Sequence, residues 1–412
     1  MKISDVQAFL MSSPMPDPVV MPFYGGVRTI YKRDGLLVKI STDGGVVGFG
    51  PGPAAESFAD TINSEVRDLL LDQDPAQTEI IKNKMGAADS HQVRAALGAV
   101  EVALYDLRGK MEGCPVYELL GGKKQDRLRV YGSAGMYQSP EDYALEAAEI
   151  KNLGYSAYKY RPALGPDEDL RTVQLMSQAL GPDVGICIDA HAWWRMGDRS
   201  YTPESVENLA QEISNLNITW LEEPLPYEDR NGYRELREKK IVPIAAGEHE
   251  NSLKGFLEII EGGCVDIAQA DVPHHGGFSG VRDVLVACEK NGIEFAFHNW
   301  GTELETISDA QLGCCFDREV SGWLEYPEYS HRGRDIMYPF PLSDDILTER
   351  LSVENGELII PDGPGLGVEV NENVIDKYPY IAGPWSIFEL DSPPQKMALS
   401  GDHSVAWDTS GT

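Results

Sequence analysis

The sequence lacks the features that would assign it to a membrane, secreted or nucleic-acid-binding protein. No uninterrupted apolar stretch approaches the ~18 residues that span a bilayer, and the opening segment MKISDVQAFL is too polar for a secretory signal. Positive charge is scarce, because 35 Lys and Arg residues against 66 Asp and Glu residues give a net charge of −31. We therefore expect a cytoplasmic protein with no membrane and no nucleic acid among its partners.

Cysteine is present without any arrangement that would hold a metal or a disulfide framework. The six cysteines show no CxxC spacing and most lie in apolar segments, so we expect buried free thiols. What remains is a soluble globular composition, with 42% hydrophobic and 25% charged residues in a chain long enough for more than one domain. An anionic substrate stays compatible with the acidic composition, because a bound cation can reverse the local field.

The N-terminal region predicts an antiparallel sheet followed by helices. Residues 1–53 have a strand pattern, and Asp43-Gly44 between two apolar segments is a strong hairpin signal. Within this region we expect a Pro- and Met-rich loop at about residues 12–28. Residues 56–120 follow a helical pattern.

The rest of the chain changes pattern twice. From about residue 127 to 343 strands alternate with helical segments, which predicts a parallel sheet. After residue 350 the segment LSVENGELIIPD predicts another hairpin. The last thirty or so residues, rich in Ser, Pro, Gly and Asp, predict an irregular extension.

Seven short apolar runs in the alternating region each end on a charged or ionisable residue. These end residues are separated by 28, 33, 26, 23, 27 and 27 positions, about the length of one strand, one helix and two loops. Strands that repeatedly end in this way predict a (β/α) barrel, whose active site is built at the C-terminal ends of its strands. The end residues are Arg161, Asp189, Glu222, Glu248, Asp271, His298 and Glu325.

Three successive strand ends are carboxylates. Oxygen ligands from Asp189, Glu222 and Glu248 suit a hard divalent cation with open positions for substrate, which favours Mg²⁺. Each alone could be an ordinary surface acid, but their recurrence at barrel spacing favours the metal. Strand alternation predicts that only one of Glu222 and Glu223 faces the centre, and that His249 points away from the metal.

The next strand ends predict a general base. Asp271 and His298 fall on adjacent strands, where a carboxylate would fix the tautomer of the imidazole and raise its basicity. The alternative is a structural histidine with a partner. Glu325 follows on the next strand and, if protonated, would donate a hydrogen bond to a substrate oxygen.

Two further pairs share a strand face, because side chains at i and i+2 point the same way. His191 accompanies Asp189 and is placed to act as a general acid, with packing as the alternative. Lys159 accompanies Arg161, and two cations there would bind a substrate carboxylate unless they form a solvated pair.

These motifs resemble those of the enolase superfamily, in its mandelate racemase-like subgroup. The resemblance extends over about residues 1–378. It is carried by AVEVALYDLRGKMEGCPVYELLGG at 99–122, the Lys159-x-Arg161 strand, the segments IDAH, WLEEP, AAGE, QAD, FHNW and WLEYP, and the tail GELIIPDGPGLGVEV.

The resemblance implies an α/β fold, a modified (β/α)7β TIM-type barrel over residues 126–343. It also implies an α+β capping domain, formed from residues 1–125 and from the segment 344–412, which returns to it and carries the extension. Proteins of this kind are often homo-oligomers. The implied functional residues are Mg²⁺ ligands at Asp189, Glu222 and Glu248, a base dyad of Asp271 and His298, and Glu325 near the substrate carboxylate.

The chain departs from the racemases of the subgroup at one position. They carry Lys-x-Lys, with the second lysine as a base facing the histidine, whereas Arg161 stands here and stays protonated. A single base, His298, with His191 as the acid favours loss of water, as in the galactonate and mannonate dehydratase-like members. We therefore predict a Mg²⁺-dependent dehydration of an aldonate or aldarate, a small-molecule acid sugar, to its 2-keto-3-deoxy product.

Two alternatives remain open, namely an epimerase, racemase or lactone cycloisomerase on the same scaffold, and a non-catalytic sugar-acid binding protein. Tyr24 and Arg28 lie in an N-terminal loop that closes over substrate in such families, and Trp193 would either wall the pocket or pack in the core. His274 and His275 lie just after Asp271 in a loop that could contact the substrate, but we expect them to be plain loop residues. The carboxylate end of the substrate would be held by Lys159, Arg161 and Glu325.

Overall fold

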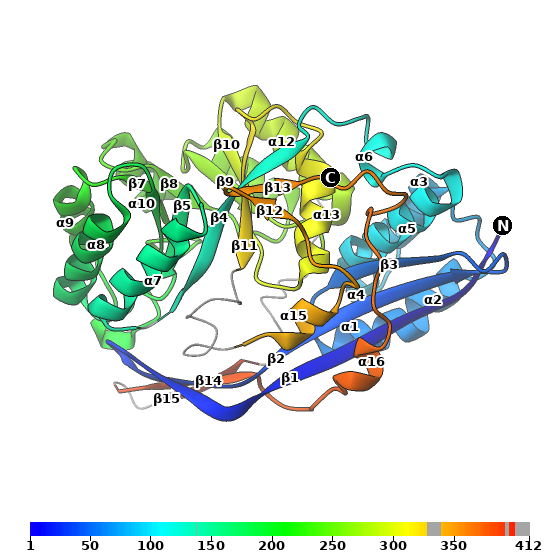
Figure 1. Cartoon of the computed structure of the whole chain (residues 1–412), viewed down its shortest axis with the longest axis horizontal. Helices are drawn as coiled ribbons and strands as arrows, with labels where there is room; N and C mark the ends of the chain where they lie inside the picture. Colours follow the sequence, from blue (N-terminus) through cyan, green and yellow to red (C-terminus); the bar gives the residue numbers. More distant parts are fainter. Residues whose placement is uncertain (137, 328–338, 392–394, 400–412) are drawn as a thin grey trace.

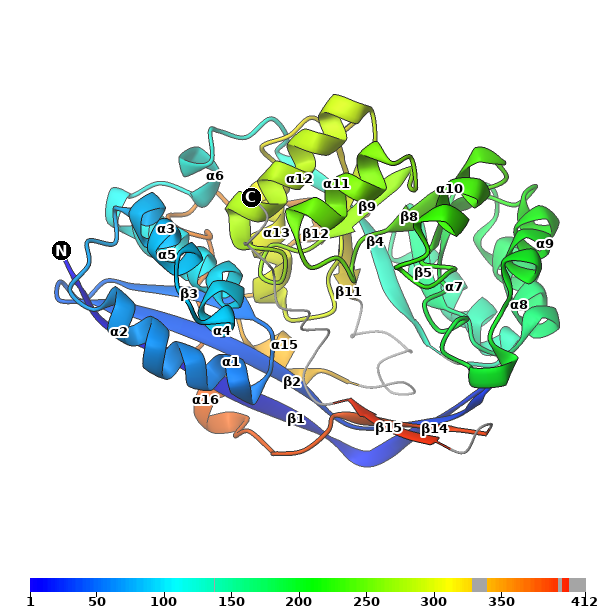
Figure 2. The ribbon, with the colours of Figure 1, turned by 180° about the vertical axis from the view of Figure 1, so that it is seen from behind.

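A computed structural model describes residues 1–136, 138–327, 339–391 and 395–399 of the protein. A closed barrel of parallel strands lies beside a group of N-terminal helices, and a long antiparallel sheet runs under both (Figure 1). The view from behind shows the same two bodies with helices on the outer face of the barrel (Figure 2). No helix within these described ranges is long and apolar enough to cross a membrane.

Eight parallel strands form the barrel and confirm the predicted fold class. They pair in chain order, and β11 pairs back with β4 through Glu325 and Tyr131, which closes the sheet. The strands are β4 (Arg127–Met136), β5 (Ala157–Arg161), β6 (Gly185–Asp189), β7 (Ile218–Glu222), β8 (Ile244–Ala246), β9 (Ile267–Ala270), β10 (Glu294–Phe297) and β11 (Ser321–Pro327).

Helices follow the first seven of these strands and begin and end at recognisable signals. Ser139, Thr202 and Ser252 cap the N-termini of three helices with their side chains, and Gly292 ends another in the left-handed conformation. The helices are α7 (Pro140–Asn152), α8 (Pro166–Leu180), α9 (Pro203–Ile213), α10 (Arg230–Glu238), α11 (Leu253–Glu261), α12 (Gly277–Asn291) and α13 (Glu303–Gly313), with a short 3-10 turn η2 (Gly197–Arg199) before α9.

One buried side chain from each strand fills the bottom of the barrel interior. Side chains alternate between the two faces of a strand, so the next inward position lies two residues further, towards the C-terminal mouth. All of the polar strand ends found in the sequence except Glu248 therefore form the second and third inward layers. The eight residues of the bottom layer are Tyr131, Ala157, Cys187, Trp220, Ala245, Ile267, Ala296 and Trp323.

The capping sheet begins with two long strands, β1 (Ile3–Phe23) and β2 (Gly26–Thr42), joined by a tight turn. The loop predicted at about residues 12–28 is therefore wrong: prolines are tolerated because the register shifts between Pro14 and Val19. β3 (Val47–Gly52) completes the predicted hairpin at Asp43-Gly44. The helices that follow these strands in the chain are α1 (Glu56–Thr61), η1 (Ile62–Val66), α2 (Arg67–Leu70), α3 (Thr78–Gly86), α4 (His91–Ala95), α5 (Leu97–Glu112) and α6 (Val116–Leu119), of which α1, η1, α2 and α5 contact the sheet.

The C-terminal region contacts both bodies. The predicted hairpin is confirmed as β12 (Val353–Glu354) and β13 (Glu357–Ile359), which pairs with β4. Asn355 and Gly356 have φ of 53° and 71°, as a two-residue hairpin turn requires. Two short helices, α15 (Pro341–Asp345) and α16 (Val374–Lys377), lie on either side of this hairpin in the chain.

The extension after Tyr380 is not irregular throughout, which corrects that prediction. β14 (Ser386–Leu390) pairs with β2, and β15 (Gln395–Leu399) pairs with β14, so the extension adds two strands to the capping sheet. Neither strand has the apolar run that would have marked it in the sequence. Their position beside residues 26–30 of β2 matters for the site described below.

Candidate active site

The barrel mouth collects the polar residues that follow the bottom layer. Two positions beyond each bottom-layer residue stand polar side chains from seven strands, and Gly247 from β8. All seven are buried, so the charges of the ionisable ones among them must be compensated by one another or by a bound group. These seven residues are Ser133, Lys159, Asp189, Glu222, Gln269, His298 and Glu325.

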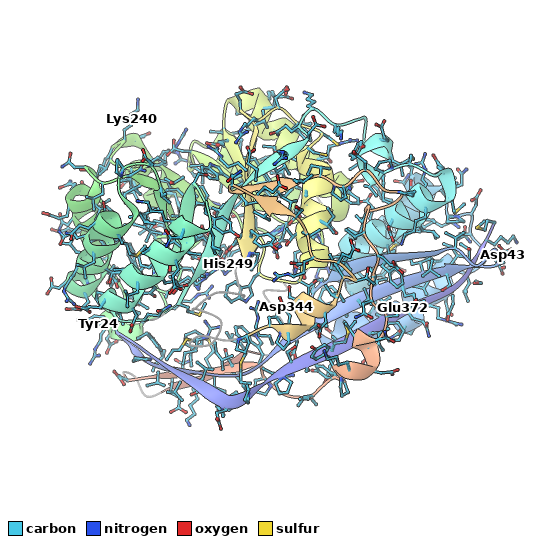
Figure 3. All side chains as sticks on the ribbon, in the orientation of Figure 1. Tyr24, Asp43, Lys240, His249, Asp344 and Glu372 are labelled. Atoms are coloured by element: carbon cyan, nitrogen blue, oxygen red, sulfur yellow. The ribbon has the colours of Figure 1, made fainter. Side chains whose placement is uncertain are left out.

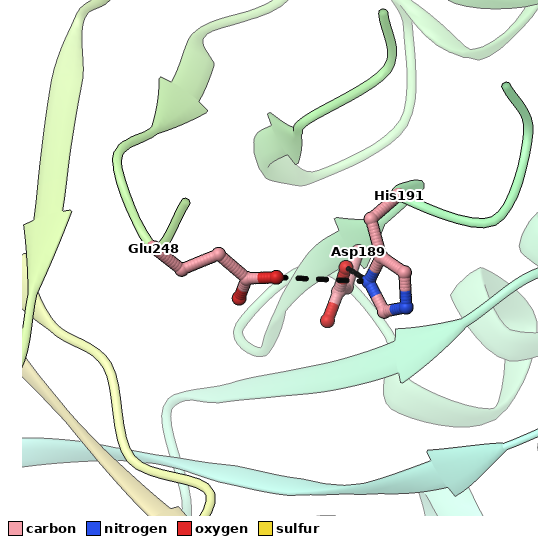
Figure 4. A group of neighbouring side chains, drawn as sticks. All are labelled: Asp189, His191 and Glu248. Carbon is pink, nitrogen blue, oxygen red and sulfur yellow. Dashed lines mark hydrogen bonds and ion pairs between the residues drawn. The ribbon is translucent and has the colours of Figure 1, made fainter. Parts of the chain in front are cut away.

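Asp189, His191 and Glu248 converge at the ends of β6 and β8 (Figure 4). Their ligand atoms lie within 4.8 Å of one another. His191 Nδ1 is 2.6 Å from Asp189 Oδ1 and 3.9 Å from Glu248 Oε1. Strand geometry thus brings His191 to the same place as Asp189, as the i, i+2 spacing predicts.

Glu222 lies on the neighbouring strand, in register with Asp189. Its two oxygens accept hydrogen bonds of 2.9 Å each, one from Lys159 Nζ and one from Trp220 Nε1. Glu222 is therefore close to the converging group without belonging to it. Burial raises the pKa of Glu222, and Lys159 offsets this only in part.

Lys159 binds carboxylates from three strands. Its Nζ donates to Glu222 at 2.9 Å and to Glu325 at 3.0 Å, and lies 3.5 Å from Asp189 Oδ2. Burial alone would lower the pKa of Lys159, but these carboxylates raise it well above its ordinary value. Lys159 is therefore a fixed cation and not a base.

Arg161 is held in the same way. Its Nε lies 3.1 Å from Asp189 Oδ2, its Nη2 lies 3.5 Å from Glu325 Oε1, and its guanidinium stands 4.2 Å from the ring centre of Trp300. The sequence predicts that Lys159 and Arg161 bind a substrate carboxylate. In the structure both neutralise carboxylates of the protein.

Glu325 accepts hydrogen bonds from three sides. Besides Lys159, Asn299 N donates to it at 3.1 Å and Tyr131 Oη at 3.0 Å. Burial alone would raise the pKa of Glu325, but Lys159 and His298 hold it below its ordinary value. These contacts favour the ionised form of Glu325, which accepts hydrogen bonds, over the protonated form that a donor role would require.

Asp271 and His298 are brought together by adjacent strands. His298 Nδ1 lies 2.6 Å from Asp271 Oδ2, and His275 Nδ1 lies 2.9 Å from Asp271 Oδ1. One carboxylate thus orients two imidazoles. His275 is expected from the sequence to be a plain loop residue, but its contact with Asp271 makes it part of this network.

The other nitrogen of His298 faces the converging group. Nε2 lies 3.0 Å from Glu248 Oε2. Burial alone would lower the pKa of His298, but Glu248 and Asp271 raise it well above its ordinary value. Both carboxylates therefore favour the protonated form of His298.

His249 does not point away from Glu248, so that prediction is wrong. Its Nδ1 lies 3.4 Å from Glu248 Oε1 and contacts Glu223 Oε2. The physical reason is that β8 ends at Ala246 and Gly247 has a φ of 142°, so strand alternation stops before Glu248. Glu223 has a φ of 44°, which is rare for glutamate, and turns its side chain to His249.

A narrow cavity opens beside the dyad. Its lining includes Glu248, His274, His298, Trp300 and Glu305. Of these, His274 and Glu305 approach each other to 3.4 Å. The sequence held a signal for His274 and His275, because both lie in the loop between β9 and α12, shortly after Asp271. A larger cavity between α3 and α12 has no converging carboxylates or imidazoles among its described lining residues, so chemistry and not size locates the site.

The three predicted substrate residues outside the strand ends are placed differently. Tyr24 is 40% exposed at the β1–β2 turn, well away from the labelled His249 (Figure 3). Arg28 is buried, with its guanidinium 4.6 Å from the Trp385 ring centre. Trp193 is buried, its ring stacks on Tyr201 and its N–H donates to Asp169. It therefore packs in the core, which is one of the two roles that the sequence left open.

The donor set fits a divalent metal. Asp189 Oδ2 is buried and accepts no hydrogen bond of good geometry within the described part of the chain, although two cations lie near it. The described residues at the mouth include five buried carboxylates against two buried cations and His298, whose pKa is raised, so negative charge is still in excess and a divalent cation would relieve it. The carboxylates are Asp189, Glu222, Glu248, Asp271 and Glu325, and the cations are Lys159 and Arg161.

Comparison with known families identifies the class of protein. A family model described as enolase C-terminal domain-like matches residues 142–374, and the model of the mandelate racemase and muconate lactonizing enzyme N-terminal domain matches residues 7–121. The chain belongs to the enolase superfamily, in its mandelate racemase subgroup, as the motifs predict.

Individual relatives of known activity carry different reaction names. The D-galactarolactone cycloisomerase of Agrobacterium fabrum is 29% identical over 92% of this chain and 99% of its own length. The D-gluconate dehydratase of Thermoproteus tenax is 30% identical over 83% of this chain and 69% of its own length. The crystal structure of the 3,6-anhydro-D-galactonate cycloisomerase from Zobellia galactanivorans matches with a TM-score of 0.77 and 28% identity, over 92% of this chain and 99% of that one.

Proposed function

We propose that the protein is a Mg²⁺-dependent sugar-acid dehydratase that converts an aldonate or aldarate to its 2-keto-3-deoxy product. One observation carries the proposal: of the three imidazoles that approach Glu248, His298 and His191 lie at different oxygens of this carboxylate. His298 Nε2 lies 3.0 Å from one oxygen of Glu248, and His191 Nδ1 lies 3.9 Å from the other. A base and an acid on two sides of one carboxylate can act on neighbouring carbons of a substrate, as β-elimination of water requires.

His298 is the proposed base. Asp271 holds its Nδ1, so Nε2 is the nitrogen that would take the proton from the carbon next to the substrate carboxylate. General acid–base catalysis of this kind contributes typically about 10²–10⁴-fold to the rate. Nε2 of His298 points towards Glu248, which follows the end of β8 at the barrel mouth.

His191 is the proposed acid. Its Nδ1 lies 2.6 Å from Asp189 and 3.9 Å from Glu248, so Nδ1 is the nitrogen turned towards the site and would carry the proton that is delivered. In the proposed step the electron pair of the broken C–H bond forms a carbon–carbon double bond. The 3-hydroxyl leaves as water with the proton of His191, and the resulting enol becomes the 2-keto acid.

The remaining residues would hold charge in place. Mg²⁺ bound by Asp189, Glu222 and Glu248 would supply positive charge beside the substrate carboxylate, an effect of about several kcal/mol. Lys159 and Arg161 keep the protein carboxylates ionised and fixed in position. Glu325 orients Lys159 and the backbone of Asn299.

A second candidate is a lactone cycloisomerase, which the two cycloisomerases among the relatives favour. The same base would act, but the leaving oxygen would belong to the ring, so the ring opens and no water is released. Two-base racemisation is not favoured, because Arg161 is ion-paired with Asp189 and Glu325 and arginine stays protonated.

The test is a panel of aldonates, aldarates and their lactones incubated with the protein and Mg²⁺, read out as 2-keto acid. Product from open-chain acids supports dehydration, and product from lactones alone supports the cycloisomerase. Exchange of the α-proton without a 2-keto product would support an epimerase or racemase instead. Binding of a sugar acid without turnover or exchange would support a non-catalytic binding protein.

A further inference from the structure

Trp300 separates the cavity beside the dyad from a second cavity on the side of the capping sheet. On the barrel side Trp300 shares the lining with His298. On the cap side it shares the lining with Arg33, Asp34 and Trp385. The two cavities therefore adjoin each other at this indole.

Trp300 is held between two guanidinium groups. Arg161 stands 4.2 Å from its ring centre and Arg33 stands 4.7 Å from it. Arg33 Nη2 also donates to the backbone oxygen of Trp300 at 2.7 Å, in a buried position. A guanidinium group that stacks on an aromatic ring and also donates to a carbonyl oxygen is held in a fixed position. Arg33 is therefore a fixed cation in the wall of the second cavity.

The C-terminal extension builds the opposite wall. Trp385 precedes β14, its oxygen accepts from Tyr31 N at 2.9 Å, and its nitrogen donates to Leu399 O at 2.8 Å. Phe388 on the same strand lies 4.7 Å from the Arg28 guanidinium, which fastens β14 to β2. The two added strands therefore place Trp385 at the cavity rather than leaving the extension as a loose end.

The second cavity is lined by one acid and one cation. The acid, Asp34, is paired within the cap: Lys32 Nζ lies 2.9 Å from its Oδ2, and Ser12 Oγ donates to its Oδ1 at 2.6 Å. Arg33 carries the opposite charge, and its guanidinium also lies 4.2 Å from the ring centre of Phe340. A planar guanidinium recognises a carboxylate with two parallel hydrogen bonds better than it recognises a hydroxyl.

From these contacts we infer that the cavity of Arg33, Asp34, Trp300 and Trp385 is the subsite for the end of the substrate remote from the reacting carbon. Arg33 binds a second carboxylate there, so the substrate class is the aldarates and not the aldonates. This inference rests on the proposed function. It also assigns a function to the C-terminal extension, which supplies Trp385 to the subsite.

The experiment compares kcat/KM for an aldarate and the aldonate of the same configuration. Wild type is expected to prefer the aldarate. Arg33→Gln is expected to reduce that preference by about 10- to 100-fold, which is the usual loss when a hydrogen bond to a charged group is removed. Arg33→Lys keeps the charge without the planar guanidinium, so its preference for the aldarate should fall between those of wild type and Arg33→Gln.

Two further variants control the measurement. Arg171→Gln removes an exposed arginine of α8 and should leave the preference unchanged. Trp385→Ala removes the contribution of the extension and should lower kcat/KM for the aldarate more than for the aldonate. If Arg33→Gln does not fold, Arg33→Lys and Trp385→Ala still decide the inference.

Failure of the inference and failure of the proposed function look different. The inference is overturned if wild type prefers the aldonate, or if Arg33→Gln lowers kcat/KM equally for the aldarate and the aldonate. The proposed function fails if neither the aldarates nor the aldonates give a 2-keto product. In that case calorimetric titration with the aldarate and aldonate in the presence of Mg²⁺ decides the inference, because Arg33 should still favour the aldarate in binding.

Discussion

The barrel mouth and the capping sheet hold their charged residues by different means. At the mouth, Lys159 contacts carboxylates from three strands, and every one of these groups is buried. In the cap, Arg28 and Arg33 lie against aromatic rings contributed by the barrel loops and the C-terminal segment. The first arrangement depends on strand register, and the second depends on which aromatic side chains the neighbouring segments supply.

This difference indicates how reaction and substrate choice are divided in the molecule. A network of buried ion pairs loses several partners when one is replaced, so it resists change. An arginine between aromatic rings can be repositioned by altering one ring. We therefore expect substitutions at the mouth to abolish the reaction, and substitutions in the cap to change which acid is used.

The largest effect is expected from metal removal, which breaks the charge balance of the mouth. Chelation should reduce turnover by about 10³-fold or more, because the metal supplies several kcal/mol. Adding Mg²⁺ should restore turnover and raise the midpoint of thermal unfolding, since it binds the folded state. Asp189→Asn should lose this thermal response. Full turnover after exhaustive chelation would contradict the metal site.

His191→Asn should have the next largest effect and should separate two roles. As an acid, His191 contributes to loss of water, so dehydration should fall by about 10²-fold while α-proton exchange in D₂O continues. Mg²⁺ affinity, measured by calorimetry, should change little. A large loss of Mg²⁺ affinity would instead make His191 a ligand, which its position between Asp189 and Glu248 also allows.

A smaller effect is expected at Asp169, which accepts hydrogen bonds from Trp193 and Tyr201 behind the mouth. Burial raises the pKa of Asp169 from 3.8 to about 6 although these bonds oppose it. The folded state therefore binds more protons than the unfolded state between about pH 4 and 6, and stability falls as pH rises through that window by up to about 3 kcal/mol.

Asp169→Asn should remove this part of the pH dependence. Urea unfolding at about pH 4 and about pH 7 measures it, with Asp167→Asn on the same helix as an exposed control. The free energy of unfolding of the Asp169→Asn variant should decline less between the two pH values than that of wild type. An identical decline in both proteins would show that Asp169 is not protonated in the folded state.

Much of the barrel could be predicted because two periods coincide in the sequence. Apolar runs of strand length recur at the length of a βα unit, and each ends on a polar residue such as Asp189 or His298. Inward-facing positions then follow from alternation, which correctly groups His191 with Asp189. The barrel and its family are confirmed, while the catalytic assignments stay predictions.

The rest depended on contacts that no local pattern records. The orientation of His249 follows from the φ of Gly247 and the early end of β8. The lowered pKa of Glu325 depends on Lys159, which lies far away in the sequence and comes near only because the barrel closes between β11 and β4. The strands β14 and β15 are short and lack an apolar run, so their pairing with β2 and with each other is seen only in the folded chain.

One measurement tests the central claim most directly, namely that His298 starts the elimination of water. Wild type and His298→Asn would be incubated with the accepted sugar acid and Mg²⁺ in D₂O and followed by NMR, with the exposed His91→Asn as a control. We expect 2-keto-3-deoxy acid from wild type and the control, and neither product nor α-proton exchange from His298→Asn. Turnover by His298→Asn at the wild-type rate would contradict the assignment of the base.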